Sequence, residues 1–105
     1  MYGHEKLLLG EVVKVSYIVT VYNKALYLPF VIRGLAGQEG EFEREFIFVD
    51  DGSTDDSVKI LGELKETLPG RVEIIEQDNK GPSVATNKGF EASTGDIIKL
   101  SLIHI

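Results

Sequence analysis

Residues 45–56 read EFIFVDDGSTDD, a short apolar run followed at once by a loop of carboxylates, glycine and hydroxyl side chains. The strand-like part, 45–49, is apolar from Phe46 onward and does not alternate with polar residues, which is typical of a strand covered on both faces in a parallel sheet. The acidic part begins with two adjacent carboxylates, Asp50 and Asp51. Because ligands of parallel α/β sheets bind beyond the carboxyl ends of the strands, this loop is the first candidate for a site.

Three further segments have the character of buried strands. VSYIVTVY (15–22) and VEIIE (72–76) are rich in β-branched residues, and IIKL (97–100) starts a fourth run. Helical patterns separate them, so the order along the chain is β-α-β-α-β-α-β. Short right-handed connections then predict an α/β fold, in which a parallel, Rossmann-like sheet lies between helices on both faces as a three-layer sandwich.

Local signals predict where the first two helices begin. Pro29 is compatible with a helix only in its first turn, so the first helix is expected to start within residues 26–28. Ser53 and Asp56 have the spacing of a capping box, which predicts the start of the second helix. Each helix carries an apolar stripe, formed by Leu28, Val31, Ile32 and Leu35 in the first and by Val58, Leu61, Leu64 and Leu68 in the second.

The third helix is expected after the Gly-Pro pair at 81–82. Ala85, Gly89 and Ala92 are small residues on one face of it, which allows a close approach to the sheet. Gly95 is expected to end this helix as a C-terminal cap.

Composition excludes several classes of function. The chain has 105 residues, 11 Lys and Arg against 17 Asp and Glu, a formal net charge of −6 and no cysteine. An acidic chain without a basic stripe is a poor candidate for binding nucleic acid. Without cysteine there is no disulfide, thiolate metal site or cysteine nucleophile. The apolar run 7–9 is too short for a signal peptide or a membrane span, so a cytoplasmic setting is expected.

Several side chains at the expected carboxyl ends of the strands are candidate ligand contacts. Asp50 and Asp51 can accept hydrogen bonds from a nucleobase or a ribose, or help to hold a divalent cation. Tyr22 can stack on a base, and Thr20 and Asn23 can hydrogen-bond one. For these residues the alternatives are a turn with a helix cap and a tyrosine at the rim of the core.

The third loop adds one cation near the same edge. Lys80 can meet a phosphate, although a solvated loop lysine is an equal alternative. Neither the glycine-rich turn of dinucleotide-binding proteins nor the phosphate-binding loop of nucleotidases occurs in the sequence, so both classes are unsupported.

Taken in register, these loops resemble the N-terminal half of a family 2 glycosyltransferase with the GT-A fold. The pieces that carry the resemblance are VSYIVTVYNK (15–24), FIFVDDGSTDDS (46–57), Asn79-x-Gly81, Ala85-x-Asn87-x-Gly89 and Gly95-Asp96-Ile97-Ile98. The resemblance covers residues 14–100 and depends on the combination of these motifs at this spacing.

The resemblance implies an enzyme that moves a sugar from a nucleoside-diphosphate sugar to an acceptor hydroxyl on a glycan, lipid or protein. By the family pattern, Thr20 and Tyr22 would line the nucleobase pocket. Asp51 would bind the edge of the base, with Asp50 supporting it or reaching the ribose. An Asp-x-Asp motif after the fourth strand would hold Mg²⁺ or Mn²⁺ on the diphosphate, and the catalytic base would come from the second half of the domain.

The sequence departs from this pattern near its end. The two positions expected to carry metal-binding carboxylates hold Leu102 and His104. The chain is therefore expected to be a fragment that keeps the nucleoside side of the donor site and has neither metal ligands nor a catalytic residue.

Residues 1–13 are expected to be a lead-in. LSLIHI (100–105) is also what the transposon end of sequencing adapters encodes, so 101–105 are predicted to be a non-native tail, with 100 as its earliest start.

Two other functions compete with the glycosyltransferase hypothesis. One is a non-catalytic nucleotide-binding or interaction module, and the other is a receiver-type phosphoacceptor. The latter expects its acidic pair after the first strand rather than the second.

An uncovered fourth strand would also favour self-association of the fragment. Many relatives carry membrane helices downstream, so the membrane face is an alternative location for the full-length parent.

Overall fold

The computed structural model describes residues 12–38, 40 and 42–101. Within these residues it contains four strands, three α-helices and one 3₁₀ turn. In chain order these are β1 (Val13–Val21), α2 (Leu28–Ala36), β2 (Phe42–Asp51), α3 (Ser57–Leu64), η1 (Lys65–Thr67), β3 (Arg71–Gln77), α4 (Pro82–Ala92) and β4 (Ile97–Ser101). The predicted alternation of strands and helices is confirmed.

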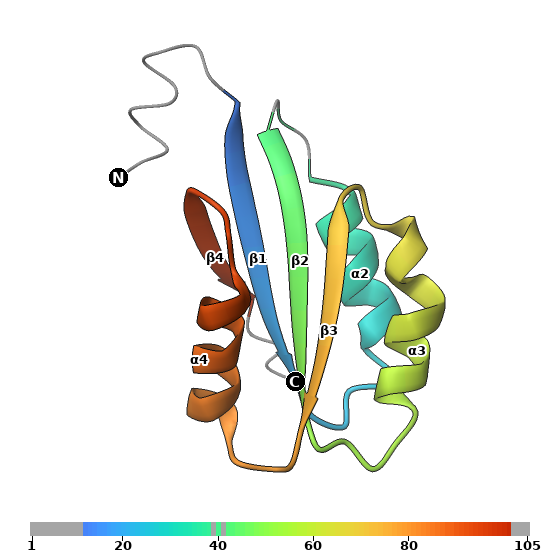
Figure 1. The fold of residues 1–105 in the computed structure, drawn as a ribbon. Coiled ribbons are helices and arrows are strands. Elements are labelled where there is room, and N and C mark those ends of the chain that lie inside the picture. Colours follow the sequence, from blue (N-terminus) through green and yellow to red (C-terminus); the bar gives the residue numbers. More distant parts are fainter. Residues whose placement is uncertain (1–11, 39, 41, 102–105) are drawn as a thin grey trace.

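The strands form one parallel sheet in the order β3-β2-β1-β4. The last residues of the three longer strands are in register, because Val21 pairs with Asp50 and Asp51 pairs with Gln77. The loops that follow β1, β2 and β3 therefore meet at one edge of the sheet, at the bottom of Figure 1. This is the edge at which the sequence predicts the site.

The sheet is covered on both faces, as expected. Helices α2 and α3 lie on one face and α4 lies on the other (Figure 1). The larger hydrophobic cluster joins α2 and α3 to alternate residues of β1 and β2, including Leu28, Ile32 and Leu61 with Phe46 and Phe48. Since the intervening residues of the same strands face α4, both central strands consist of nearly continuous apolar runs.

The small-residue face of α4 allows the predicted close approach to the sheet. Ala85 and Gly89 are its buried residues. A Cβ atom added at Gly89 would lie 2.3 Å from Cγ2 of Ile18 in β1. No side chain fits there without a shift, so glycine at this position sets the distance between the helix and the sheet.

Two of the predicted helix boundaries are wrong and one is confirmed. Helix α2 begins at Leu28, with Pro29 in its first turn. Helix α3 begins at Ser57 rather than after a capping box at Ser53, because the Ser53 hydroxyl oxygen accepts from the Asn23 backbone N–H instead of from a helix N–H. Helix α4 ends at Ala92, before Gly95.

Gly95 has a different role from the predicted cap. A Cβ atom at this position would lie 2.4 Å from the Ser16 hydroxyl oxygen and 3.0 Å from the Lys14 carbonyl oxygen. The absence of a side chain at Gly95 lets the chain pass close beside β1 before it enters β4.

A buried carboxylate lies away from the predicted site, among the first residues of the strands. Glu45 has no exposed surface. It accepts hydrogen bonds from the Ser16 hydroxyl at 2.6 Å, the Thr94 backbone N–H at 2.6 Å and the Arg71 guanidinium at 2.8 Å. Burial would raise its pKa, but the hydrogen bonds from Ser16 and Thr94, together with the Lys14 charge, lower the pKa to about 2. Glu45 thus ties β1, β2, β3 and the entry to β4 together.

The predicted lead-in and tail lie largely outside the described residues, which exclude 1–11 and 102–105. Val13 already belongs to β1, one residue before the predicted limit of the domain. Ser101 pairs with Val19 as the last residue of β4. No helix among the described residues combines the length and apolar character needed to cross a membrane.

Candidate functional site

The loops after β1 and β2 are joined by Asn23. Its backbone has a positive φ of 50°. Its side-chain oxygen accepts from the backbone N–H of Thr54 at 2.8 Å and of Asp55 at 3.3 Å. Its own backbone N–H donates to the Ser53 hydroxyl at 2.9 Å. Asn23 therefore binds the second loop through both its backbone and its side chain.

Asp55 makes a second connection between the same loops. Its carboxylate accepts from the Ala25 backbone N–H at 3.1 Å, and from the Ser57 backbone N–H at 2.9 Å and hydroxyl at 2.5 Å. Burial would raise the pKa of Asp55, but the hydrogen bonds from Ser57 and Ala25 outweigh it and lower the pKa. The buried Ser57 hydroxyl also accepts from the Lys24 backbone N–H at 3.0 Å.

Asp50 is buried and belongs to the second loop's own turn. Its carboxylate accepts from the Ser53 backbone N–H at 2.9 Å and from the Ser53 hydroxyl at 2.5 Å. Because side chains alternate along a strand, Asp50 projects on the face that carries α2 and α3, like Phe48.

Asp51 is also buried but binds the third loop, on the α4 side of the sheet. Its Oδ1 accepts from the Gln77 side-chain amide at 2.9 Å and the Lys80 backbone N–H at 2.7 Å, and its Oδ2 accepts from the Gly81 backbone N–H at 3.0 Å. Burial would raise the pKa of Asp51, but these three hydrogen bonds outweigh it and lower the pKa. Asp51 is therefore a hydrogen-bond acceptor at neutral pH.

The second and third loops also touch directly through their backbones. The Asn79 side-chain amide donates to the Asp51 carbonyl oxygen at 3.0 Å. Gly52 has a φ of 76°, and a Cβ atom there would lie 2.7 Å from the Asn79 backbone nitrogen. Glycine is needed at this position for both the backbone conformation and the close contact.

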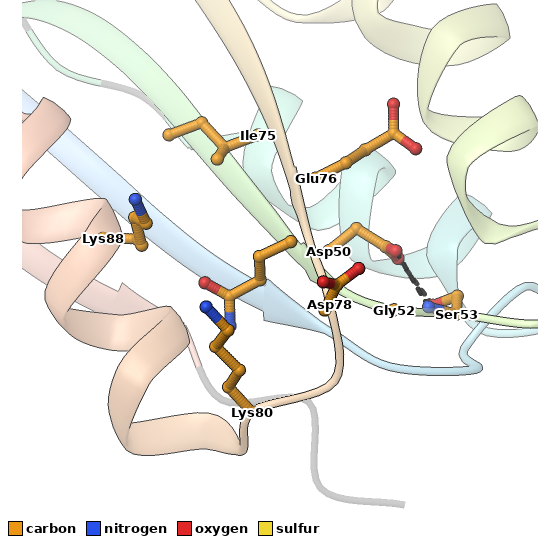
Figure 2. Close-up of a pocket in the computed structure, with 9 residues that line it drawn as sticks. Asp50, Gly52, Ser53, Ile75, Glu76, Asp78, Lys80 and Lys88 are labelled. Atoms are coloured by element: carbon orange, nitrogen blue, oxygen red, sulfur yellow. Dashed lines mark hydrogen bonds between the residues drawn. The ribbon is translucent and has the colours of Figure 1, made fainter.

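A depression of about 510 Å³ opens where these loops meet. Figure 2 shows its lining, with the Asp50–Ser53 hydrogen bond on one side and, on the other, Lys80 from the third loop and Lys88 from α4. Its lining residues are Asp50, Gly52, Ser53, Ile75, Glu76, Gln77, Asp78, Lys80 and Lys88. Three carboxylates and two ammonium groups therefore surround one space.

The structure brings only some of the predicted site residues into this depression. Asp50 and Lys80 line it, and Asp51 lies directly beneath the third loop. Tyr22, 46% exposed, follows the last residue of β1, while Thr20 is half-buried within β1. Asn23 binds the second loop rather than lining the depression.

Seven of the nine lining residues are not among the predicted site residues, and four of these are Glu76, Gln77, Asp78 and Lys88. Glu76, Gln77 and Asp78 fall at the end of β3, where any side chain is a candidate by the rule that identified Asp50 and Asp51. Lys88 lies inside α4, and no motif in the sequence indicates that this helix face reaches the site.

The described residues do not provide a metal site. Across 12–38, 40 and 42–101, no three His, Cys, Asp or Glu side chains are grouped so as to hold a metal ion. The hydrogen bonds to Asp50 and Asp51 come from backbone and side-chain donors of the loops, so both carboxylates organise the loops around them.

Comparisons with known proteins relate the chain to glycosyltransferases. An uncharacterised glycosyltransferase of Nostoc sp. is 39% identical over 81% of this chain and 26% of its own length. The minor teichoic acid biosynthesis protein GgaA of Bacillus subtilis is 37% identical over 71% of this chain and 17% of its own length. The chain thus spans about a quarter or less of these two relatives.

The fold has a similar counterpart among solved structures. Staphylococcus aureus TarS in complex with UDP-GlcNAc superposes with a TM-score of 0.73 and 29% identity, covering 85% of this chain and 26% of that one. This likeness confirms the α/β fold and its relation to GT-A glycosyltransferases. The family model described as glycosyl transferase family 2 matches residues 16–100. The chain belongs to glycosyl transferase family 2.

Proposed function

We propose that residues 12–101 form the nucleoside-binding part of a glycosyltransferase, which moves a sugar from a nucleoside-diphosphate sugar to an acceptor hydroxyl. The observation that carries the proposal is the pair of buried carboxylates, Asp50 and Asp51, at the carboxyl end of β2 beside an open depression. Family membership supports the reaction class. The UDP-GlcNAc bound by TarS supports a nucleotide-sugar donor for this chain.

Asp51 is the proposed contact for the edge of the base. A carboxylate has about four acceptor positions, and the third loop uses two on Oδ1 and one on Oδ2. One position on Oδ2 therefore remains for a ligand N–H. Since the lowered pKa keeps Asp51 ionised, this site favours bases with a ring N–H, such as uracil, thymine or guanine.

Five other side chains complete the proposed donor site. Tyr22 is exposed enough to stack on the base, and Thr20 stands one position before the end of β1. Lys80 brings a positive charge to the depression, where a diphosphate would otherwise meet Asp50. Asn23 belongs to the same loop cluster, and Asp50 is proposed to face the ribose.

The remaining parts of the reaction are proposed for the complete protein rather than for these residues. A Mg²⁺ or Mn²⁺ ion would neutralise the diphosphate leaving group, but the described residues do not fit such an ion. Leu102 and His104 lie outside the described residues. We also propose that the acceptor is a glycan, lipid or protein. The proposed location of the complete protein is the cytoplasm or the membrane face.

A transfer assay on the complete protein tests the proposed function. UDP-, GDP- and dTDP-sugars are supplied with Mg²⁺ or Mn²⁺, and release of the nucleoside diphosphate is measured in the wild type, Asp51→Asn and Glu63→Gln. Glu63 is an exposed residue of α3 and serves as the matched control. Transfer in the wild type and the control, with loss in Asp51→Asn, supports the proposal. Absence of transfer from every donor contradicts it.

A further inference from the structure

We propose that Asn23 is a positioning residue of the donor site, which holds the loops after β1 and β2 together through its side-chain oxygen. This inference rests on the proposed function and deepens it, since Asn23 then acts on the nucleotide through its neighbours. The sequence alone suggested a direct contact between Asn23 and the nucleotide. The hydrogen bonds of Asn23 point instead into the second loop.

The backbone at Asn23 explains why this residue type is present. A φ of 50° lies in the left-handed region, which asparagine, aspartate and glycine enter at lower cost than other residues. In that conformation Oδ1 reaches the consecutive N–H groups of Thr54 and Asp55. The positive φ and the two accepted hydrogen bonds are therefore parts of one arrangement.

Ser53 extends this arrangement to a proposed ligand contact. Its hydroxyl accepts from the Asn23 backbone N–H and donates its single proton to the Asp50 carboxylate. A hydroxyl that accepts from one fixed donor has its own proton directed elsewhere. The path Asn23–Ser53–Asp50 thus links the first loop to a carboxylate that lines the depression.

Tyr22 is the residue through which this link is expected to affect nucleotide binding. It immediately precedes Asn23, and with 46% of its surface exposed it has limited packing of its own. The orientation of its ring therefore depends strongly on the backbone at residues 22–23. When the Asn23 side-chain hydrogen bonds are removed, the loop that follows Tyr22 loses that connection to the loop that follows Asp50.

Substitutions at Asn23 separate positioning from direct contact. Asn23→Gly keeps the backbone conformation but loses the acceptor, so it is expected to weaken uridine binding about tenfold. Asn23→Asp keeps Oδ1 and loses the side-chain NH₂. Measured with the uncharged probe uridine, to avoid repulsion from a diphosphate, it is expected to retain affinity within about threefold. Equal losses in both variants would identify a direct contact through the NH₂ group and overturn the proposal.

A double-mutant cycle tests the path through Ser53. Asn23→Gly removes the side-chain acceptor but keeps the backbone N–H that donates to Ser53, whereas Ser53→Ala removes the acceptor of that N–H. If the two connections hold the second loop as one unit, the single variants lose similar affinity and the double variant binds UDP little worse than either. Independent, multiplicative losses would contradict a shared path. If Asn23→Gly fails to fold, Ser53→Ala replaces it, and hydrogen exchange of the loop amides is measured in that variant.

Hydrogen exchange of the loop amides provides a readout that needs no ligand. In the 105-residue chain, the Thr54 and Asp55 amides are expected to exchange faster in Asn23→Gly and at near wild-type rates in Asn23→Asp. Unchanged exchange in Asn23→Gly would overturn the positioning role. If the wild type binds neither uridine nor UDP, GDP or dTDP, the proposed function fails, while the exchange measurement still decides the role of Asn23.

Discussion

Asp50 and Asp51 are consecutive residues, yet their carboxylates bind different loops. Asp50 accepts from Ser53 in the loop that leads to α3, whereas Asp51 accepts from Lys80 and Gly81 at the start of α4. The alternation of side chains along β2 produces this division. The two residues therefore organise different walls of the depression. For this reason we expect them to contribute differently to nucleotide binding.

Asp51→Asn is expected to weaken nucleoside-diphosphate binding by tenfold or more. The amide replaces one acceptor oxygen with an NH₂ group, which then faces N–H donors from the third loop. An unsatisfied or opposed buried polar group costs about 1–3 kcal/mol, so the unfolding free energy should also fall. Calorimetric titration and urea unfolding measure the two effects. Glu63→Gln, at an exposed carboxylate of α3 outside the depression, is the control, and equal behaviour of both variants would contradict the role of Asp51.

Glu45 is expected to make stability depend on acid pH. Its pKa is lowered from 4.5 to about 2 in the folded chain, so its contribution is complete above about pH 4.5 and is lost as the pH falls through about 2. This difference corresponds to about 3 kcal/mol. Urea unfolding between pH 7 and pH 2 is expected to show a steeper loss for the wild type than for Glu45→Gln.

The same experiment has an internal control. Asp51 and Asp55 also have lowered pKa values, so Glu45→Gln should retain part of the acid dependence. Glu63→Gln, on the exposed side of α3, should keep the whole profile. A wild-type profile that is superimposable on that of Glu45→Gln would argue against the buried carboxylate.

Gly89→Ala is expected to lower the unfolding free energy by about 1–3 kcal/mol, because the new methyl group overlaps the Ile18 side chain. Gly62→Ala is the matched control, since a Cβ atom at Gly62 meets nothing within 4 Å. That substitution should be neutral or stabilise α3 by up to about 1 kcal/mol. Thermal unfolding of the two variants gives the comparison, and a Gly89→Ala variant as stable as Gly62→Ala would disprove close packing of α4.

Tyr22→Ala is expected to reduce nucleotide affinity by roughly 5- to 100-fold, in line with about 1–3 kcal/mol for stacking of a base on an aromatic ring. Tyr22→Phe should retain most of the affinity, because the ring remains. Since Tyr22 is 46% exposed, both variants should unfold close to the wild-type midpoint. Tyr27→Ala, at the residue before α2, is the control for removal of a nearby tyrosine. Retained affinity in Tyr22→Ala would refute the stacking role.

The sequence contains enough information for the topology but not for several contacts. The central strands are predictable because burial on both faces leaves continuous apolar runs, as in residues 45–49. The capping box at Ser53 fails because the backbone N–H of Asn23, from another loop, donates to the Ser53 hydroxyl oxygen. No local pattern shows that Gly95 passes against Ser16 or that Glu45 meets Thr94, since these pairs are far apart in the chain. Such contacts are determined by the assembled sheet.

The most direct test of the central claim is an NMR titration of the 105-residue chain with UDP, GDP and dTDP, with ADP and CDP as controls. The account predicts saturable shifts of the amide signals of Tyr22, Asp51 and Lys80 with at least one nucleotide that carries a ring N–H. It predicts weaker effects with ADP and CDP, whose bases lack that donor, and none at Glu63. Shifts spread evenly over all five nucleotides, or absent from the loops after β1, β2 and β3, would contradict a nucleoside-diphosphate site at this edge of the sheet.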